Sequence, residues 1–113
     1  MAPLGDGGAQ ALSIALKANT GLLNFELSSN SIGDDGAFFL AGAIKVNKTL
    51  QVLTLSNNKI GCKGASFIGH ALKINTTLLS IDLSANHVAD AGSQTLCDSL
   101  KVCAAGVTVH VCM

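Results

Sequence analysis

The sequence has no Arg, Trp or Tyr, a single Pro, and only 12% charged residues. Its basic and acidic side chains, seven of each, cancel to a formal net charge of zero. Nucleic-acid-binding domains carry a basic face, so this composition argues against a nucleic-acid partner. Because 49% of the residues are hydrophobic, the composition is also far from that of a disordered chain.

Long hydrophobic segments are absent as well. A membrane span needs about 20 apolar residues, whereas the apolar stretch 36–44 is short and contains two Gly, so we expect no membrane span. The first residues, Met-Ala-Pro-Leu-Gly-Asp, contain neither the basic start nor the apolar core of a secretory signal. We therefore expect a cytoplasmic protein.

A repeat with a period of 28 residues dominates what the sequence does contain. The pattern L-x-x-(L/F/I)-x-L-x-x-N occurs at 22–30, 50–58 and 78–86. Further columns keep the same phase, among them Gly8, Gly36, Gly64 and Gly92. A fixed period of this length is the sequence signature of a solenoid.

Each repeat unit has two parts. Alternating apolar residues around Phe25 and Leu27 predict a short strand, which recurs within 50–55 and 78–83 and again at Val107–Val111. Ala37, Leu40, Ala41 and Ile44 follow helical spacing after the Gly column. One strand and one helix cannot bury their apolar faces alone, so neighbouring units must stack.

The ends of these helices carry recurring polar residues. Asp34 sits where we expect it to cap or oppose the dipole of its own helix. Asn19, Asn47 and Asn75 end the helices, where we expect the left-handed conformation that Asn tolerates. Asn47 and Asn75 also begin glycosylation sequons, but their shared repeat phase favours a structural explanation.

The three L-x-x-(L/F/I)-x-L-x-x-N cores, followed by (I/V)-x-x-x-G and a helix ending in (A/S)-(L/I)-K, resemble the leucine-rich repeat. The length is similar to that of the ribonuclease-inhibitor-like subtype, which also occurs in NOD-like innate immune receptors. The resemblance implies an α/β fold, a short leucine-rich repeat solenoid with parallel strands on the concave face and helices on the convex face. It also implies that Asn30, Asn58 and Asn86 form a buried asparagine ladder.

The repeat register predicts one domain over 1–113. It divides into a half repeat at 2–21, repeats at 22–49, 50–77 and 78–105, and a terminal strand at 106–113. Leu12 and Leu16 in the half repeat are expected to lack a covering neighbour. The last strand is expected to be an unpaired edge, so a homodimer through the ends is possible.

The concave face is the family's usual contact surface. Alternation along the strands places eight candidate partner-binding residues there, namely Asn24, Glu26, Val52, Thr54, Ser80, Asp82, Thr108 and His110. They form a small polar patch in which Glu26 and Asp82 could oppose a cationic group. The alternative is a solvated face without a ligand. Without Trp, Tyr or Arg, affinity through this patch is expected to be modest.

Other features of the sequence have simpler explanations than a binding or catalytic site. Lys17, Lys45, Lys73 and Lys101 share one phase and could meet an anionic partner, but exposed Lys heads over covered stems are the preferred interpretation. The four Cys form no C-x-x-C pair and no zinc-finger spacing, so we expect free thiols, no metal and no cofactor. Cys62 is expected in a loop. The three His fall in different phases beside no evident nucleophile, so no enzyme is predicted.

These features predict a non-enzymatic protein-protein interaction module with a protein partner. The resemblance to NOD-like receptor repeats implies a role in innate immune recognition or regulation. Two alternatives stay open. One is a structural or assembly subunit that stacks through its open ends. The other is a regulator of an enzyme or small GTPase.

Overall fold

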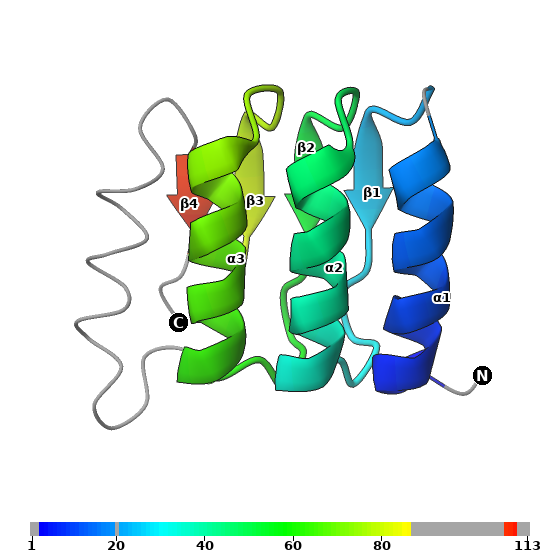
Figure 1. Ribbon diagram of the computed structural model, residues 1–113. Coiled ribbons are helices and arrows are strands. Elements are labelled where there is room, and N and C mark those ends of the chain that lie inside the picture. The colour runs from blue at the N-terminus through cyan, green and yellow to red at the C-terminus, as the bar shows by residue number, and fades with distance from the viewer. Residues whose placement is uncertain (1–2, 20, 87–107, 111–113) are drawn as a thin grey trace.

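The computed structural model describes residues 3–19, 21–86 and 108–110. Over residues 5–82, helices and strands alternate along the chain and lie side by side in two layers (Figure 1). The elements are α1 (Gly5–Ala18), β1 (Asn24–Glu26), α2 (Asp34–Val46), β2 (Val52–Thr54), α3 (Cys62–Ile74), β3 (Ser80–Asp82) and β4 (Thr108–His110).

The strands form a single parallel sheet in the order β1-β2-β3-β4. Phe25 pairs with Leu53, Leu53 with Ile81, and Ile81 with Val109, so each step along the sheet advances the sequence by one repeat. This parallel arrangement confirms the predicted α/β leucine-rich repeat solenoid. Of the predicted last strand, Val107 and Val111 lie outside the described residues.

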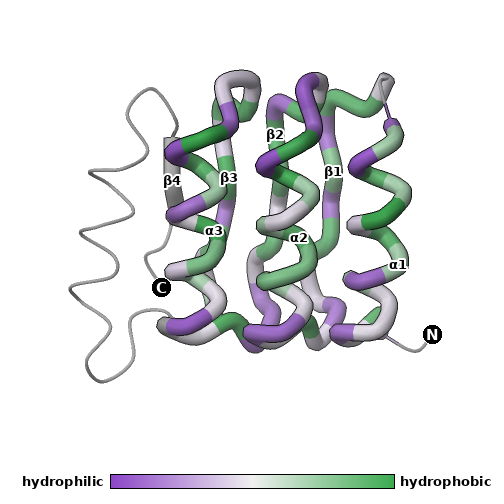
Figure 2. Tube along the Cα trace, viewed as in Figure 1, coloured by the Kyte–Doolittle hydropathy of each residue, from purple (hydrophilic) through white to green (hydrophobic). Residues whose placement is uncertain are grey.

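The hydrophobic core lies between the helix layer and the sheet. Leu53 and Ile81 enter it from the strands, and Leu40 and Ile68 enter it from the helices, all with 0% exposure. Corresponding hydrophobic positions recur from one coil to the next along the tube in Figure 2. The core is therefore continuous across the coils, as stacking of repeats requires.

The Gly column exists because neighbouring helices approach closely at their first turns. A Cβ atom added at Gly64 would lie 2.9 Å from the Ala37 Cβ and 2.8 Å from Asp34 Oδ1. Gly36 is equally crowded, with Asp6 Oδ1 at 2.7 Å and Ile32 Cγ2 at 2.6 Å. A side chain at either position would force neighbouring atoms apart.

The expected left-handed conformation at the helix ends is wrong. Asn19, Asn47 and Asn75 are extended, with φ of −78°, −66° and −70° and ψ near 135°. The reason is that hydrogen bonds to the Asn side chain, and not a left-handed backbone, turn the chain at the end of the helix. In Asn47, Oδ1 accepts the N–H groups of Thr49 and Leu50, which turns the chain into the next strand.

The helix starts also differ from expectation. Asp34 is the first residue of α2 and makes no cap on its own helix, whose N-cap is Gly33. Its Oδ1 instead accepts the N–H groups of Gly61 and Gly64 in the following coil. Cys62, expected in a loop, is the first residue of α3. The predicted cap of Asp34 on its own helix is therefore wrong, whereas its place in the first turn of α2 agrees with the alternative expectation that it opposes the dipole of that helix.

At the β1 end of the sheet, the expected exposure of Leu16 is wrong, because this side chain is only 2% exposed. It turns inward against the core of its own coil. Leu12 is half-buried and helps to line a shallow hollow of about 70 Å³ together with Leu22 and Phe25. The β1 edge therefore retains a small apolar recess.

Candidate functional site

The strand face carries the candidate partner-binding residues in two rows. The sheet register places Asn24, Val52, Ser80 and Thr108 side by side in one row, and Glu26, Thr54, Asp82 and His110 in the other. Asn24 and Glu26 are exposed, whereas the four members in β2 and β3 are half-buried. Between the rows, Leu53 and Ile81 are buried. In β1, β2 and β3, this alternation directs both rows away from the core.

Both carboxylates on this face also fix the turn that follows their strand. Glu26 Oε1 accepts the Ser28 N–H at 2.8 Å. Asp82 Oδ1 accepts the Ser84 N–H at 2.9 Å and the Ser84 hydroxyl at 2.6 Å. No Lys pairs with either carboxylate in the part of the chain that the structure describes. A partner's donor would therefore meet carboxylates that are already oriented by their own backbone.

Beside this face, Asn58 and Asn86 connect successive coils. Asn58 Oδ1 accepts the Asn30 and Ile32 N–H groups at 2.9 and 3.0 Å, and its Nδ2 donates to the Leu27 carbonyl at 3.0 Å. Asn86 repeats the arrangement one coil further on, with its Oδ1 accepting the Ile60 N–H. Asn58 and Asn86 are only 6% and 7% exposed, so they hold the coils together and are not accessible to a partner. Asn30 is half-buried and accepts the Leu4 N–H.

A second asparagine ladder runs along the opposite ends of the strands, and the sequence interpretation missed it. Asn47 Nδ2 donates to the Leu16 and Asn19 carbonyls of the preceding coil at 2.9 and 3.2 Å. Asn75 does the same toward Ile44 and Asn47. The shared phase of these Asn was visible, and the Thr two residues later was the remaining clue. Because the Asn47 amide is buried and donating, its sequon has a structural explanation.

The strand-to-helix loops contain an open polar hollow of about 390 Å³, which no sequence pattern predicted. Its lining residues are Ser29, Ser31, Asn57, Asn58, Lys59 and Ala85. Ser29, Asn57 and Ala85 occupy one repeat phase and all have positive φ, between 54° and 60°. Asn57 Nδ2 donates to the Ser29 hydroxyl at 2.9 Å, so two of the polar residues that line the hollow already bond to each other.

Other classes of site find little support in the described residues. Over 3–19, 21–86 and 108–110, no three His, Cys, Asp or Glu side chains gather as metal ligands. His70 is exposed on α3, and Cys97, Cys103 and Cys112 lie outside this part of the chain. None of the described helices combines the length and apolar character needed to cross a bilayer.

Comparisons with known proteins agree with this architecture. A family model described as "Leucine Rich repeat" matches residues 18–41, 46–69 and 75–97, which together exceed half of the chain. A solved structure titled "Leiomodin-1 Actin-Binding Site 2 (ABS2)" is similar, with a TM-score of 0.82 and 27% sequence identity. The alignment covers 96% of this chain but only 63% of the other. No curated protein matches.

Proposed function

The chain belongs to the leucine-rich repeat family, and we propose that it is a non-enzymatic protein-interaction module that acts in the cytoplasm. The observation that carries this proposal is the two-row strand face. Six described side chains point away from the core there, while the other face of the sheet is covered by helices. A partner could contact all strands at once without any rearrangement of the core.

The ribonuclease-inhibitor-like subtype is part of this proposal. It is supported by the 28-residue step of the sheet register and by helices of 14, 13 and 13 residues in successive coils. A full helix in each of the three coils whose helical part the structure describes distinguishes this arrangement from repeats that carry only a 3₁₀ segment there.

Actin is the first partner to test, because the similar leiomodin structure is titled as an actin-binding site. Since this chain spans only 63% of that structure, binding of actin by the described coils is a proposal. The proposal of a role in innate immune recognition rests only on the likeness of the repeat cores to those of NOD-like receptors. Regulation of an enzyme or small GTPase would use the same strand face but has no further support.

The experiment is a titration of purified actin with the full chain. Thr54 is the sharpest position to change, because it lies on the strand between Glu26 and Asp82 and its side chain is half-buried at the centre of its row. Thr54→Lys should weaken binding at least tenfold if the strand face is the contact. Thr76→Lys makes the same substitution at an exposed position in the loop after α3, so it is the matched control and should bind as the wild type does.

Two results would contradict the proposal in different ways. No binding of actin by the wild-type chain would exclude this partner. Equal binding by the wild type and Thr54→Lys would exclude the strand face as the contact.

A second candidate function, assembly through the sheet edges, is favoured by one observation at Asn19. In Asn47 and Asn75 the amide nitrogen donates to two carbonyls of the preceding coil. Asn19 Oδ1 accepts the Gly21 and Leu22 N–H groups just after its helix, as the Oδ1 atoms of Asn47 and Asn75 accept N–H groups after theirs. Asn19, however, is exposed at the β1 edge. A further coil, including one from a second copy of the chain, could place its carbonyls where they accept hydrogen bonds from the Asn19 amide.

Sedimentation that shows a monomer up to high micromolar concentration would contradict a homodimer through the ends.

A further inference from the structure

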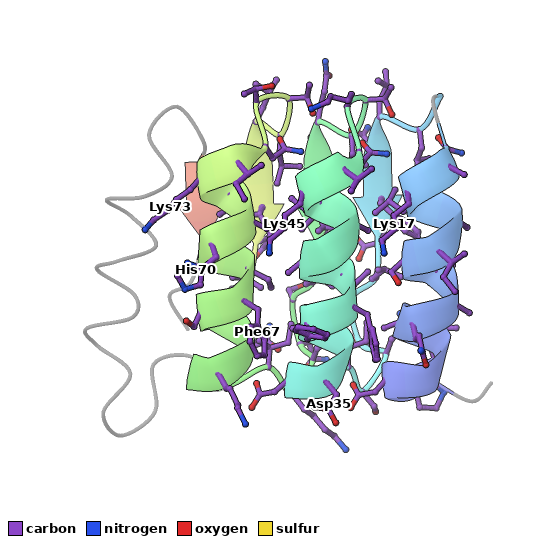
Figure 3. All side chains as sticks on the ribbon, in the orientation of Figure 1. Lys17, Asp35, Lys45, Phe67, His70 and Lys73 are labelled. Atoms are coloured by element: carbon purple, nitrogen blue, oxygen red, sulfur yellow. The ribbon has the colours of Figure 1, made fainter. Side chains whose placement is uncertain are left out.

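The outer side of the helix layer carries two rows of residues that repeat from helix to helix. Lys17, Lys45 and Lys73 form an exposed row near the helix ends, as Figure 3 shows. The next row, one turn earlier in each helix, contains Ile14, Gly42 and His70. Ile14 is 64% exposed, so this row is not a closed packing surface.

An aromatic cluster lies below these rows, between α2 and α3. The Phe38 and Phe67 ring centroids are 5.0 Å apart in an edge-to-face arrangement, and Phe38 and Phe39 are 5.6 Å apart. Phe67 packs against the core, but Phe38 is 53% exposed. Three aromatic rings held on a helical surface, with the outermost half open to solvent, present a rigid apolar anchor point.

Gly42 lies at the centre of this surface, one turn from Phe38 and three residues from Lys45. Nothing lies within 4 Å of a Cβ atom added there, in contrast to the crowded Gly36 and Gly64. Gly in a helix interior is destabilising relative to Ala, and no contact within the described chain requires it here. Because Gly42 has no side chain, the helix surface beside the exposed Phe38 ring is flat at this position.

We propose that this helical surface is a second docking site, and that its occupant is an acidic amphipathic α-helix of a protein partner. An apolar side chain of that helix sits over Gly42 against Phe38, and its carboxylates meet the Lys row. Packed helices lie about 8–10 Å apart, so successive Lys are separated by about the same distance. In an α-helix, residues seven apart lie on one face at about 10 Å, so acidic residues at that interval match the Lys row.

A membrane surface also binds Lys and aromatic side chains, but it fits this site less well. Asp35, which is exposed at the start of α2, carries a negative charge on the Phe38 side of the same helix. An anionic bilayer would approach Asp35 and the Lys row together, whereas a single helix can follow the Lys row alone. Three Lys also give only a modest attraction to anionic lipid.

The test uses the full chain and a synthetic helical peptide of about 21 residues, with Leu along one stripe and Glu at every seventh position beside it. Fluorescence anisotropy should give a dissociation constant on the order of tens of micromolar for the wild type. The decisive variant is Gly42→Gln. The Gln side chain occupies the open space at residue 42. It should also raise the thermal stability of the chain, because Gln is a better helix former than Gly. A folded, more stable protein that binds the peptide about tenfold more weakly is the expected result.

Charge variants separate the Lys row from general electrostatics. Lys45→Glu should weaken peptide binding by roughly threefold to tenfold, since exposed ion pairs are individually weak. Lys48→Glu makes the same charge change in the loop after α2 and should leave binding unaltered. A peptide with Lys in place of Glu should not bind.

Three results would overturn the proposal. The first is no peptide binding by the wild type at millimolar concentration. The second is equal binding by the wild type and Gly42→Gln. The third is binding to phosphatidylserine vesicles in the absence of peptide binding, which would assign the surface to a membrane instead.

Discussion

Asp34 Oδ1 accepts the backbone N–H of Gly64 at 3.0 Å, so the first residue of α2 caps the first turn of α3. The same oxygen accepts the Gly61 N–H at 2.7 Å. Asp6 makes the corresponding bond to Gly33, one coil earlier, at 2.6 Å. A carboxylate that opposes the dipole of the next helix links adjacent coils through their helix starts as well as through the sheet.

Asp34→Ala should therefore lower the free energy of unfolding by about 1–2 kcal/mol, as loss of a helix cap does. Asp35→Ala is the matched control, because the neighbouring carboxylate is exposed and makes no such bond among the described residues. Urea denaturation followed by circular dichroism measures both. Equal midpoints for the two variants would contradict a cap that acts across the coils.

The asparagine ladder should be most sensitive at Asn58, whose side chain bonds to both its own coil and the preceding one. Asn58→Ala leaves buried N–H and carbonyl groups without a partner and should cost about 1–3 kcal/mol. Asn24→Ala, at an exposed strand position, should change stability by less than about 0.5 kcal/mol. An unchanged denaturation midpoint for Asn58→Ala would remove the ladder from the account of stability.

Two Gly→Ala substitutions in the helices should have opposite signs. Gly64→Ala forces a Cβ atom to 2.9 Å from the Ala37 Cβ and should destabilise by about 1–3 kcal/mol through overpacking. Gly42→Ala meets open space and should stabilise by about 0.5–1 kcal/mol. Thermal unfolding of both variants tests this contrast. If both substitutions stabilise the chain, the helices are not packed as closely as described.

Much of this fold follows from the repeat period. Once Leu22, Leu50 and Leu78 define the phase, a parallel sheet is the arrangement that places Phe25, Leu53 and Ile81 in line. Which of the neighbours a polar side chain bonds to does not follow in the same way. The Asp34 carboxylate could cap either helix by spacing alone, and only the distance between coils selects the following one.

The candidate sites show a similar division. Alternation was sufficient to place Asn24 and Thr54 on one side of the sheet, because the side-chain period of a strand is two. Nothing in one sequence reveals that Phe38 remains exposed beside Phe67, since a helical aromatic pattern is equally typical of a core. The open space at Gly42 likewise depends on neighbouring helices and not on local pattern.

Ala85 holds a positive φ of 56°, in the phase that Ser29 and Asn57 also occupy. The left-handed conformation costs a non-Gly residue about 1–2 kcal/mol, while Gly loses about 0.5–1 kcal/mol in chain entropy. Ala85→Gly should therefore stabilise the chain by up to about 1 kcal/mol, and Ala85→Val should destabilise it. Differential scanning calorimetry gives the sign of each change. A lower melting temperature for Ala85→Gly would contradict the strain assigned to this turn.

Quantitative mass spectrometry of proteins captured from native cell extract tests whether the strand face binds protein partners. Wild type, Thr54→Lys on the strand face and Thr76→Lys in the loop after α3 would be compared in parallel. We expect at least one protein to be captured by the wild type and by Thr76→Lys and to be lost with Thr54→Lys. Captured sets that are the same for all three chains would contradict it.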